Sequence, residues 1–352
     1  MVYYIRFLKT PRTQAVKPGL VSVSALISVT TDLGDAFLAE DVVLQAQLID
    51  AGTMESANSV LQEFSYKWEA GRRELAISIG PVRLASKVSR VILAIGTKST
   101  STVNLDTDLC DPTRVPLVIS GWSAPFGVSQ NTPAEKLIER RFMLQNKIQL
   151  RIWEETGNNI ARHIWQNAIG SSGNCSMRQL RSHLERKSNS NQSIQAIELG
   201  SGCGIVGIAL AQMLPRCSIT LTDLPEVQDI MACNLQLTRS AAGSTCDFKQ
   251  LDWEDERDGD NMPRPPMDLI LVSDCTYNAD SLPSLVRVLT RLVQASPQAV
   301  VLVSLKQRHE SEAVFFELMR RAGFTIMEES AHALPAAYSE QDSIEMYAFV
   351  RA

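Results

Sequence analysis

Beyond Ile194 the sequence alternates short apolar runs typical of strands with longer runs typical of helices. This alternation constrains the fold most strongly, because strands connected by helices form a parallel sheet with helices on both faces. We expect strands within 193–199, 218–223, 248–253, 267–274, 299–305, 324–330 and 343–350, and helices within 204–214, 227–238, 282–293 and 311–323. No helix separates the last two strands, so one of them must run antiparallel. The predicted fold class is α/β.

The first part of the chain has a different pattern. Between Phe7 and Leu117, runs rich in Val, Ile, Leu and Ser are separated by turn residues, which is typical of antiparallel strands. The runs are GLVSVSALISV (19–29), DVVLQAQLI (41–49), ELAISIGPVRL (74–84) and SRVILAIG (89–96). Residues 111–127 are rich in proline and glycine, and we interpret them as a linker or a closing strand. These patterns predict a smaller β-rich domain over residues 1–128.

The second predicted domain covers residues 129–352 and is expected to open with a helix. In TPAEKLIERRFML (132–144), Thr132 can cap a helix, Pro133 suits its first turn and Glu135 lies early in it.

Charge and cysteine content exclude several kinds of partner. The formal net charge is -5, so no global basic field attracts nucleic acid, which we do not expect as the main partner.

The first residues lack the basic-then-apolar order of a secretory signal, and the longest uncharged apolar run, 18–31, is too short to span a membrane. Seven cysteines without a C-x-x-C pair and four scattered histidines predict no structural metal site. The odd cysteine count fits the reducing cytoplasm or nucleus.

The glycine-rich stretch IELGSGCGIVG (197–207) allows two interpretations. Gly202 to Gly207 match the G-x-G-x-x-G fingerprint of dinucleotide-binding folds, which would indicate a nucleotide-dependent oxidoreductase. However, the apolar strand ends at Leu199, so the turn begins at Gly200 and the frame from Glu198 to Gly204 fits better. An acidic residue before a G-x-G-x-G loop suits a cofactor with an ammonium group, such as S-adenosyl-L-methionine (SAM). Glu198 could bind that ammonium, and the amides of Gly200, Ser201 and Gly202 could bind the cofactor's carboxylate.

Three residues at the ends of the next two predicted strands suit the adenosine half of SAM. Asp223 ends its strand, where a carboxylate can bind both ribose hydroxyls, although it could instead cap the following helix. Trp253 could stack on the adenine while Asp252 hydrogen-bonds the amino group; the alternative is a tryptophan of the core.

These motifs, together with DLILVSDCTYN (268–278) and in this order, resemble the class I seven-strand methyltransferases. More narrowly, they resemble the protein-lysine methyltransferases that modify calmodulin, translation elongation factors and the valosin-containing protein. The resemblance implies a Rossmann-like seven-stranded methyltransferase domain, SAM as cofactor and transfer to the ε-amine of a lysine in a protein substrate. It also implies that Trp165, in EETGNNIARHIWQNAI (154–169), packs over the methionine end of SAM.

The sequence Asp274-Cys275-Thr276-Tyr277 matches the D-x-x-Y signature of this family. The resemblance implies that Ser273 contacts SAM and that Asp274 and Tyr277 shape the lysine pocket. A lysine amine has a pKa of about 10.4 and attacks a methyl group only when neutral, so an aromatic, partly desolvated pocket with an orienting carboxylate suits the reaction. The structural alternative is that Asp274 caps a helix and Tyr277 only packs.

A catalytically inactive binding or assembly protein remains an alternative to the enzyme. Its support in the sequence is Gln166, which stands where relatives commonly carry Asp.

Overall fold

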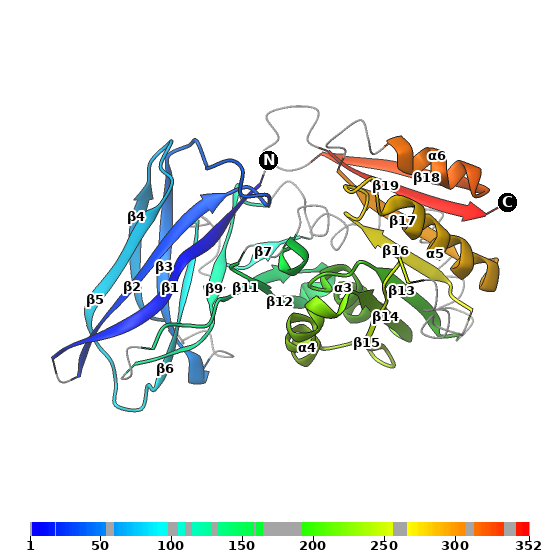
Figure 1. Ribbon diagram of the computed structural model, residues 1–352. Helices are drawn as coiled ribbons and strands as arrows, with labels where there is room; N and C mark the ends of the chain where they lie inside the picture. Colours follow the sequence, from blue (N-terminus) through cyan, green and yellow to red (C-terminus); the bar gives the residue numbers. More distant parts are fainter. Residues whose placement is uncertain are drawn as a thin grey trace. The chain divides into compact units, whose positions relative to one another are not determined.

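The computed structural model describes residues 2–17, 19–53, 60–97, 105–109, 115–128, 132–157, 160–164, 192–255, 266–306, 313–333 and 343–351 (Figure 1). The chain forms two compact units, which we describe separately. The first consists of Met1–Asp108, Thr113–Met143 and Arg151–His163. The second consists of Leu109–Pro112, Leu144–Leu150 and Ile164–Ala352.

The first unit contains two sheets. The four-stranded sheet has the order β5-β2-β1-β8, from β1 (Tyr3–Lys17), β2 (Leu20–Thr30), β5 (Leu75–Arg83) and β8 (Val118–Ile119). The other has the order β12-β11-β9-β6-β3-β4, with β10 beside β6 and β7 beside β11. Its strands are β3 (Val42–Asp50), β4 (Val60–Trp68), β6 (Arg90–Thr97), β7 (Thr107–Asp108), β9 (Gly121–Ser123), β10 (Phe126–Gly127), β11 (Leu137–Met143) and β12 (Gln149–Glu155).

The predicted antiparallel strands of this unit are confirmed at β2, β3, β5 and β6. The strands β1 and β4, which the run analysis did not single out, pair antiparallel with β2 and β3. Apolar side chains alternate along these strands, and those of both sheets, such as Ile27 and Leu48, form one buried core. Within 111–127 the described residues form the short strands β8, β9 and β10 rather than a linker.

The helix expected over 132–144 is wrong, because residues 137–143 form the strand β11. The expectation rested on the helix-start signals Thr132, Pro133 and Glu135, which are local. In the structure, Glu139 and Arg140 are fully buried in a sheet, where each has ionic partners. The predicted boundary at 128/129 therefore falls before the strands β11 and β12 of this sheet.

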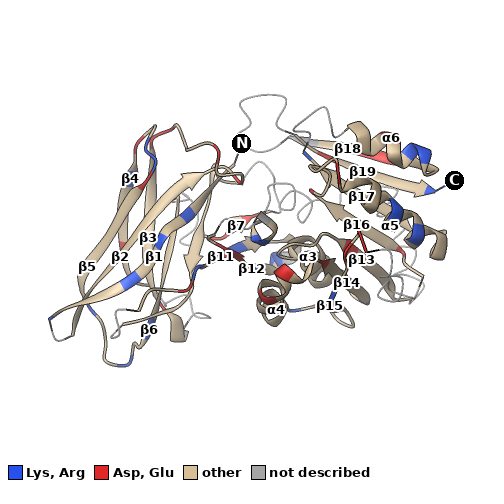
Figure 2. Ribbon diagram, viewed as in Figure 1, with Lys and Arg blue, Asp and Glu red and all other residues tan. Residues whose placement is uncertain are grey.

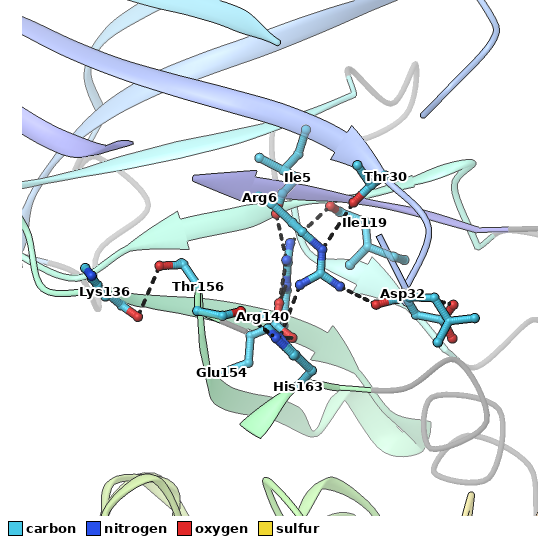
Figure 3. Close-up of polar contacts among 12 residues, drawn as sticks. Ile5, Arg6, Thr30, Asp32, Ile119, Lys136, Arg140, Glu154, Thr156 and His163 are labelled. Carbon is cyan, nitrogen blue, oxygen red and sulfur yellow. Dashed lines mark hydrogen bonds and ion pairs between the residues drawn. The ribbon is translucent and has the colours of Figure 1, made fainter. Parts of the chain in front are cut away.

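Arg140 lies at the centre of a buried polar network (Figure 3). Its Nε donates to Glu154 Oε1 at 2.7 Å, and its other nitrogens donate to the carbonyls of Ser120 at 2.8 Å and Ile5 at 2.7 Å. Burial by itself raises the pKa of Glu154, but Arg140, His163 and Arg6 together more than offset this and hold the pKa well below its usual range. Arg140 and Glu154 are thus both charged in the interior.

Arg6 and His163 extend this network. Arg6 donates through Nε to Thr30 Oγ1 at 3.2 Å, and its Nη2 donates to the carbonyl of Asp32 at 2.6 Å. Its Nη1 lies 3.2 Å from Nδ1 of His163, whose Nε2 lies 2.9 Å from the carbonyl of Gly157. The network therefore joins β1 to the segment that follows β12.

The second unit is a mixed α/β structure around a seven-stranded sheet of order β15-β14-β13-β16-β17-β19-β18. The strands are β13 (Ile194–Leu199), β14 (Cys217–Asp223), β15 (Thr245–Gln250), β16 (Leu269–Ser273), β17 (Val300–Leu305), β18 (Phe324–Ala333) and β19 (Ser343–Arg351). The helices are α3 (Ile205–Met213), α4 (Gln228–Leu237), α5 (Leu282–Ala295) and α6 (Ala313–Arg321). Each overlaps a predicted element, although β15 begins before the predicted strand and ends at Gln250 rather than at Asp252 and Trp253. The strand β19 is the antiparallel strand that the missing helix requires.

Helices cover both faces of this sheet. Ile197 and Leu199 belong to a core with residues of α5 and α6, whereas the intervening Glu198 points to the opposite face and contacts Gly207 of α3. Among the described residues, no helix is long and apolar enough to cross a bilayer.

The strand order reverses beside β13. The chain proceeds from β13 to β14 and β15 on one side, then crosses to β16 and β17 on the other. The carboxyl ends of β13 and β16 are therefore neighbours that diverge into different loops, the position where open α/β sheets bind ligands.

Candidate active site at the carboxyl edge of the sheet

The loop after β13 depends on its glycines. Gly200, Gly202 and Gly204 have φ values of 65°, 53° and 79°, in the left-handed region that glycine adopts without strain. A Cβ on Gly200 would lie 2.5 Å from Cys275 Sγ and 3.2 Å from the ring of Trp253. The turn begins at Gly200, as predicted, and packs directly against the loop after β16.

Asp223 holds this loop to the end of β14. Its two carboxylate oxygens each accept a backbone N–H, from Gly202 and from Leu224, both at 2.7 Å. Burial raises its pKa, an effect that these hydrogen bonds partly oppose. Each oxygen keeps a second lone pair, so the side chain can still accept from ligand hydroxyls.

The side chain of Glu198 contacts α3 rather than the glycine loop. Its carboxylate is buried and accepts the N–H of Gly207 in the first turn of α3, at 2.9 Å. Burial raises its pKa to about 8, against the opposing effect of this hydrogen bond. The structure thus gives Glu198 a helix-capping contact, and its contact with a cofactor ammonium stays a prediction.

The end of β16 carries the second part of the site. Asp274 is buried and has a φ of 55°, a conformation that side chains other than glycine rarely adopt. Its N–H donates to the carbonyl of Ser304 at 2.9 Å, which holds it at the end of β17. Strained backbone of this kind concentrates at functional sites.

Tyr277 lies close to these carboxylates but faces solvent with 54% of its surface. Partial burial raises the pKa of its phenol, and the neighbouring Cys275, Asp223 and Asp274 raise it further. The phenol is therefore neutral at physiological pH and can donate a hydrogen bond.

Cys275 packs between two strand ends of the site. Its Sγ lies 3.5 Å from the carbonyl of Leu199 and 3.2 Å from that of Ser273, bridging the ends of β13 and β16. Burial raises its pKa well above the usual range, so the thiol is not an activated nucleophile.

Two serine hydroxyls at this edge are available to a ligand. Ser201 Oγ and Ser273 Oγ are buried and have no hydrogen-bond partner in the described part of the chain. Buried hydroxyls normally have a hydrogen-bond partner. Two buried hydroxyls without one, at the ends of adjacent strands, therefore fit a site that a polar ligand completes. Together with the glycine loop and Asp223, they fit the amino acid and ribose groups of SAM.

The remaining predicted residues have different placements. Trp253 is partly buried, and its ring lies against Gly200, so it is close to the loop while also packing on the core. Asp252 is exposed, and its Oδ1 accepts the N–H of Glu254 at 2.9 Å. Trp165, with Gln166, lies outside the described residues.

Sequence reasoning missed three residues that position the site: Thr222, Ser304 and Cys275 in its bridging role. Thr222 Oγ1 donates to the carbonyl of Glu198 at 2.7 Å, and its own carbonyl accepts the N–H of Ser201 at 3.0 Å. These contacts join strands far apart in the sequence, so no local pattern could identify them.

Residues 144–322, just over half of the chain, match the protein family described as lysine methyltransferase. The chain belongs to this lysine methyltransferase family. The matched residues include the glycine loop, Asp223 and the D-x-x-Y signature, and they favour a methyltransferase over the oxidoreductase alternative.

The chain is also similar to individual proteins, two of which are named lysine methyltransferases. The chain is 24% identical to the UPF0665 family protein C23C4.06c of Schizosaccharomyces pombe over 89% of this chain and 91% of that protein. It is 29% identical to the protein-lysine N-methyltransferase rrg1 of the same yeast, over 53% of this chain and 61% of rrg1. The protein N-lysine methyltransferase METTL21A of Danio rerio is also 29% identical, over 45% of this chain and 66% of that protein. The chain thus spans less than two thirds of these two named methyltransferases.

Replacing Gly200 with alanine is expected to destabilise the second unit by about 2–4 kcal/mol and to abolish SAM binding, because the new methyl group adds overpacking to backbone strain. Urea unfolding and calorimetric titration with SAM measure the two effects. The matched control is Gly323→Ala, which has a φ of 83° but no atom closer than 3.8 Å to the new Cβ. Equal destabilisation and equal SAM binding in both variants would show that the close approach to Cys275 is unimportant.

Proposed function

We propose that this member of the lysine methyltransferase family transfers a methyl group from SAM to the ε-amine of a lysine in a protein substrate. The observation that carries the proposal is the meeting of three strand ends at one edge of the sheet. The Gly200 loop, Asp223 and the Asp274–Tyr277 signature come from β13, β14 and β16, and contacts through Gly202 and Cys275 join them.

We assign the cofactor contacts to this edge. In the proposed arrangement, the amides of the glycine loop and the hydroxyls of Ser201 and Ser273 hold the amino acid end, and Asp223 holds the ribose. Trp253 lies beside the adenine, with Asp252 near the amino group, and Trp165 covers the methionine end. When bound, SAM supplies an electrophilic methyl group on a sulfonium, so the leaving group needs no protonation.

The chain's own residues act on the acceptor amine. The Asp274 carboxylate and the neutral Tyr277 phenol are placed to accept and direct the N–H groups of a lysine, which orients its lone pair. Partial desolvation beside Tyr277 lowers the amine pKa, whereas the Asp274 carboxylate raises it, so the carboxylate serves to orient the amine, whose proton leaves to solvent before the attack. No further acid–base residue is required.

The domain assignment is part of the proposal. We propose that the seven-stranded unit is a Rossmann-like methyltransferase domain and that the β-rich N-terminal part, predicted over residues 1–128, docks the protein substrate. Since the five described cysteines are all free, we further propose that the protein acts in the cytoplasm or nucleus.

The test is incubation of the pure protein with tritiated SAM and an extract of its own organism, read as labelled bands on a gel. The proposal expects a discrete protein band whose label mass spectrometry places on lysine. Bound SAM without any labelled protein would instead favour the inactive binding protein or a small-molecule acceptor.

Binding of SAM is expected to release close to one proton at pH 7, if Glu198 holds the ammonium. With a pKa of about 8, most of this carboxyl is protonated before binding, and a neighbouring cation favours its ionised form. The release appears as a dependence of the binding enthalpy on the ionisation enthalpy of the buffer. The control Glu198→Gln should remove this dependence on the buffer. If the unmodified protein shows no such dependence, Glu198 does not bind the ammonium and only caps α3.

A further inference from the structure

The four-stranded sheet of the first unit carries positive charge only. Its strands contain no Asp or Glu, while the chain as a whole has a net charge of -5. Figure 2 shows positive positions spaced along β1. The basic residues are Arg6, Lys9, Arg12, Lys17 and Arg83.

Pairing of the strands places four of these residues on one face. Lys17 lies opposite Leu20, and Leu20 lies opposite Arg83, so the three residues form a row across the sheet. Residues directly opposite each other share a face. Arg12 begins a second row through Ser24 and Ser78, and Lys9 begins a third through Leu26 and Ala76.

The face that carries these rows is the solvent side. Val23, Ala25 and Ile27 alternate with the β2 residues of the rows and are buried in the core. Lys9, Arg12, Lys17 and Arg83 are all exposed, and we call these four residues the basic face.

The charges of the basic face have no neutralising partner among the described residues. In the described part of the chain, none of the four side chains has an ion pair or a hydrogen bond. Elsewhere, exposed charges do pair: Lys67 lies 2.8 Å from Asp41, and Glu317 binds both Arg320 and Arg321. Separation of like charge onto one sheet face favours encounter with a partner of opposite charge.

We propose that the basic face docks an acidic segment of the protein substrate. This partner assignment rests on the proposed function, since it takes the acceptor to be a protein. Leu8 and Val16 of β1 are also exposed, so the same strand offers apolar contact beside the charges. The four strands expose no aromatic side chain that could stack on a base, which distinguishes the face from a single-stranded nucleic acid platform.

The test uses the full chain and a fluorescein-labelled peptide of ten glutamates, with binding followed by fluorescence anisotropy at low salt. The triple variant Lys9→Thr, Arg12→Thr, Lys17→Thr is expected to bind about tenfold more weakly, because each lost exposed ion pair contributes modestly. Threonine is chosen because it favours strands. The matched control Lys87→Thr, Lys136→Thr, Lys249→Thr removes three other exposed cations and should bind as the unmodified protein does.

Three outcomes would overturn the proposal. Equal weakening in both triple variants would mean that only net charge matters. Tighter binding of a labelled single-stranded RNA, lost in the β1 variant, would identify a nucleic acid surface. Self-association detected by light scattering and lost in the same variant would identify a second copy as the occupant. SAM titrations on these samples separate the two proposals, because SAM binding does not require the basic face.

Discussion

Arg140→Met is expected to lower the free energy of unfolding of the first unit by about 3–5 kcal/mol, because it leaves the buried Glu154 carboxylate without its partner. The two side chains are almost completely buried, and the pair also supports backbone carbonyls of β1 and of the segment after β8. Urea unfolding followed by tryptophan fluorescence measures the change, since Trp68 and Trp122 are buried in this unit.

The effect of pH gives a second signature of this pair. In the unmodified protein the lowered pKa of Glu154 stabilises the fold above the unfolded-state value of about 4.3, and this contribution is lost as pH falls towards the folded-state pKa. Without Arg140, burial is opposed only by His163 and Arg6, so the pKa of Glu154 is higher than in the unmodified protein and the variant loses less stability as pH falls. The difference between the two proteins should therefore shrink at low pH.

Two controls separate this effect from a general loss of charge. Arg140→Met combined with Glu154→Met should be less destabilising than Arg140→Met alone, because no unpaired charge is buried. Lys67→Met breaks the exposed pair with Asp41 and should change stability little. A double variant as unstable as the single one would contradict the assigned role of the buried charge.

Asp274→Asn is expected to reduce methyl transfer by about 100-fold or more while leaving SAM affinity unchanged, because it removes the carboxylate that orients the amine. Asparagine is chosen because it tolerates the left-handed backbone conformation, so the φ of 55° is retained. Transfer of label from tritiated SAM to the identified substrate gives the rate, and calorimetry gives the affinity.

Two further variants test this division of roles. Asp280→Asn removes an exposed carboxylate just before α5 and should leave transfer unchanged. Asp223→Asn should instead weaken SAM binding, since Asp223 holds the glycine loop through Gly202. Full transfer by the Asp274→Asn protein would refute the pocket assignment.

Local periodicity was sufficient to predict most strands and helices of the second unit. Most of them are continuous runs with a simple apolar pattern, and glycines mark the turn after Leu199; the polar strand β15 is the exception. The candidate residues at the ends of β13, β14 and β16 follow from that order, because parallel strands place their carboxyl ends on one edge. The predicted role of Trp165 stays a prediction, since that residue lies outside the described chain.

The same reasoning failed at 137–143, where the helix-start signals Thr132, Pro133 and Glu135 indicated a helix but the residues form the strand β11. Glu139 and Arg140 are buried because partners elsewhere in the sheets, such as Arg151 and Glu154, neutralise them. Such pairing depends on contacts between separate strands, which a local pattern does not contain.

The sequence by itself determined the α/β order of the second unit, the position of the glycine turn and the residue types of the candidate site, because these depend on neighbours along the chain. Only the tertiary structure decided that Glu198 caps α3, that Cys275 bridges two strand ends and that Arg140 is buried in β11. Each of these depends on groups from distant segments, whose hydrogen bonds and burial exist only after the sheets have formed.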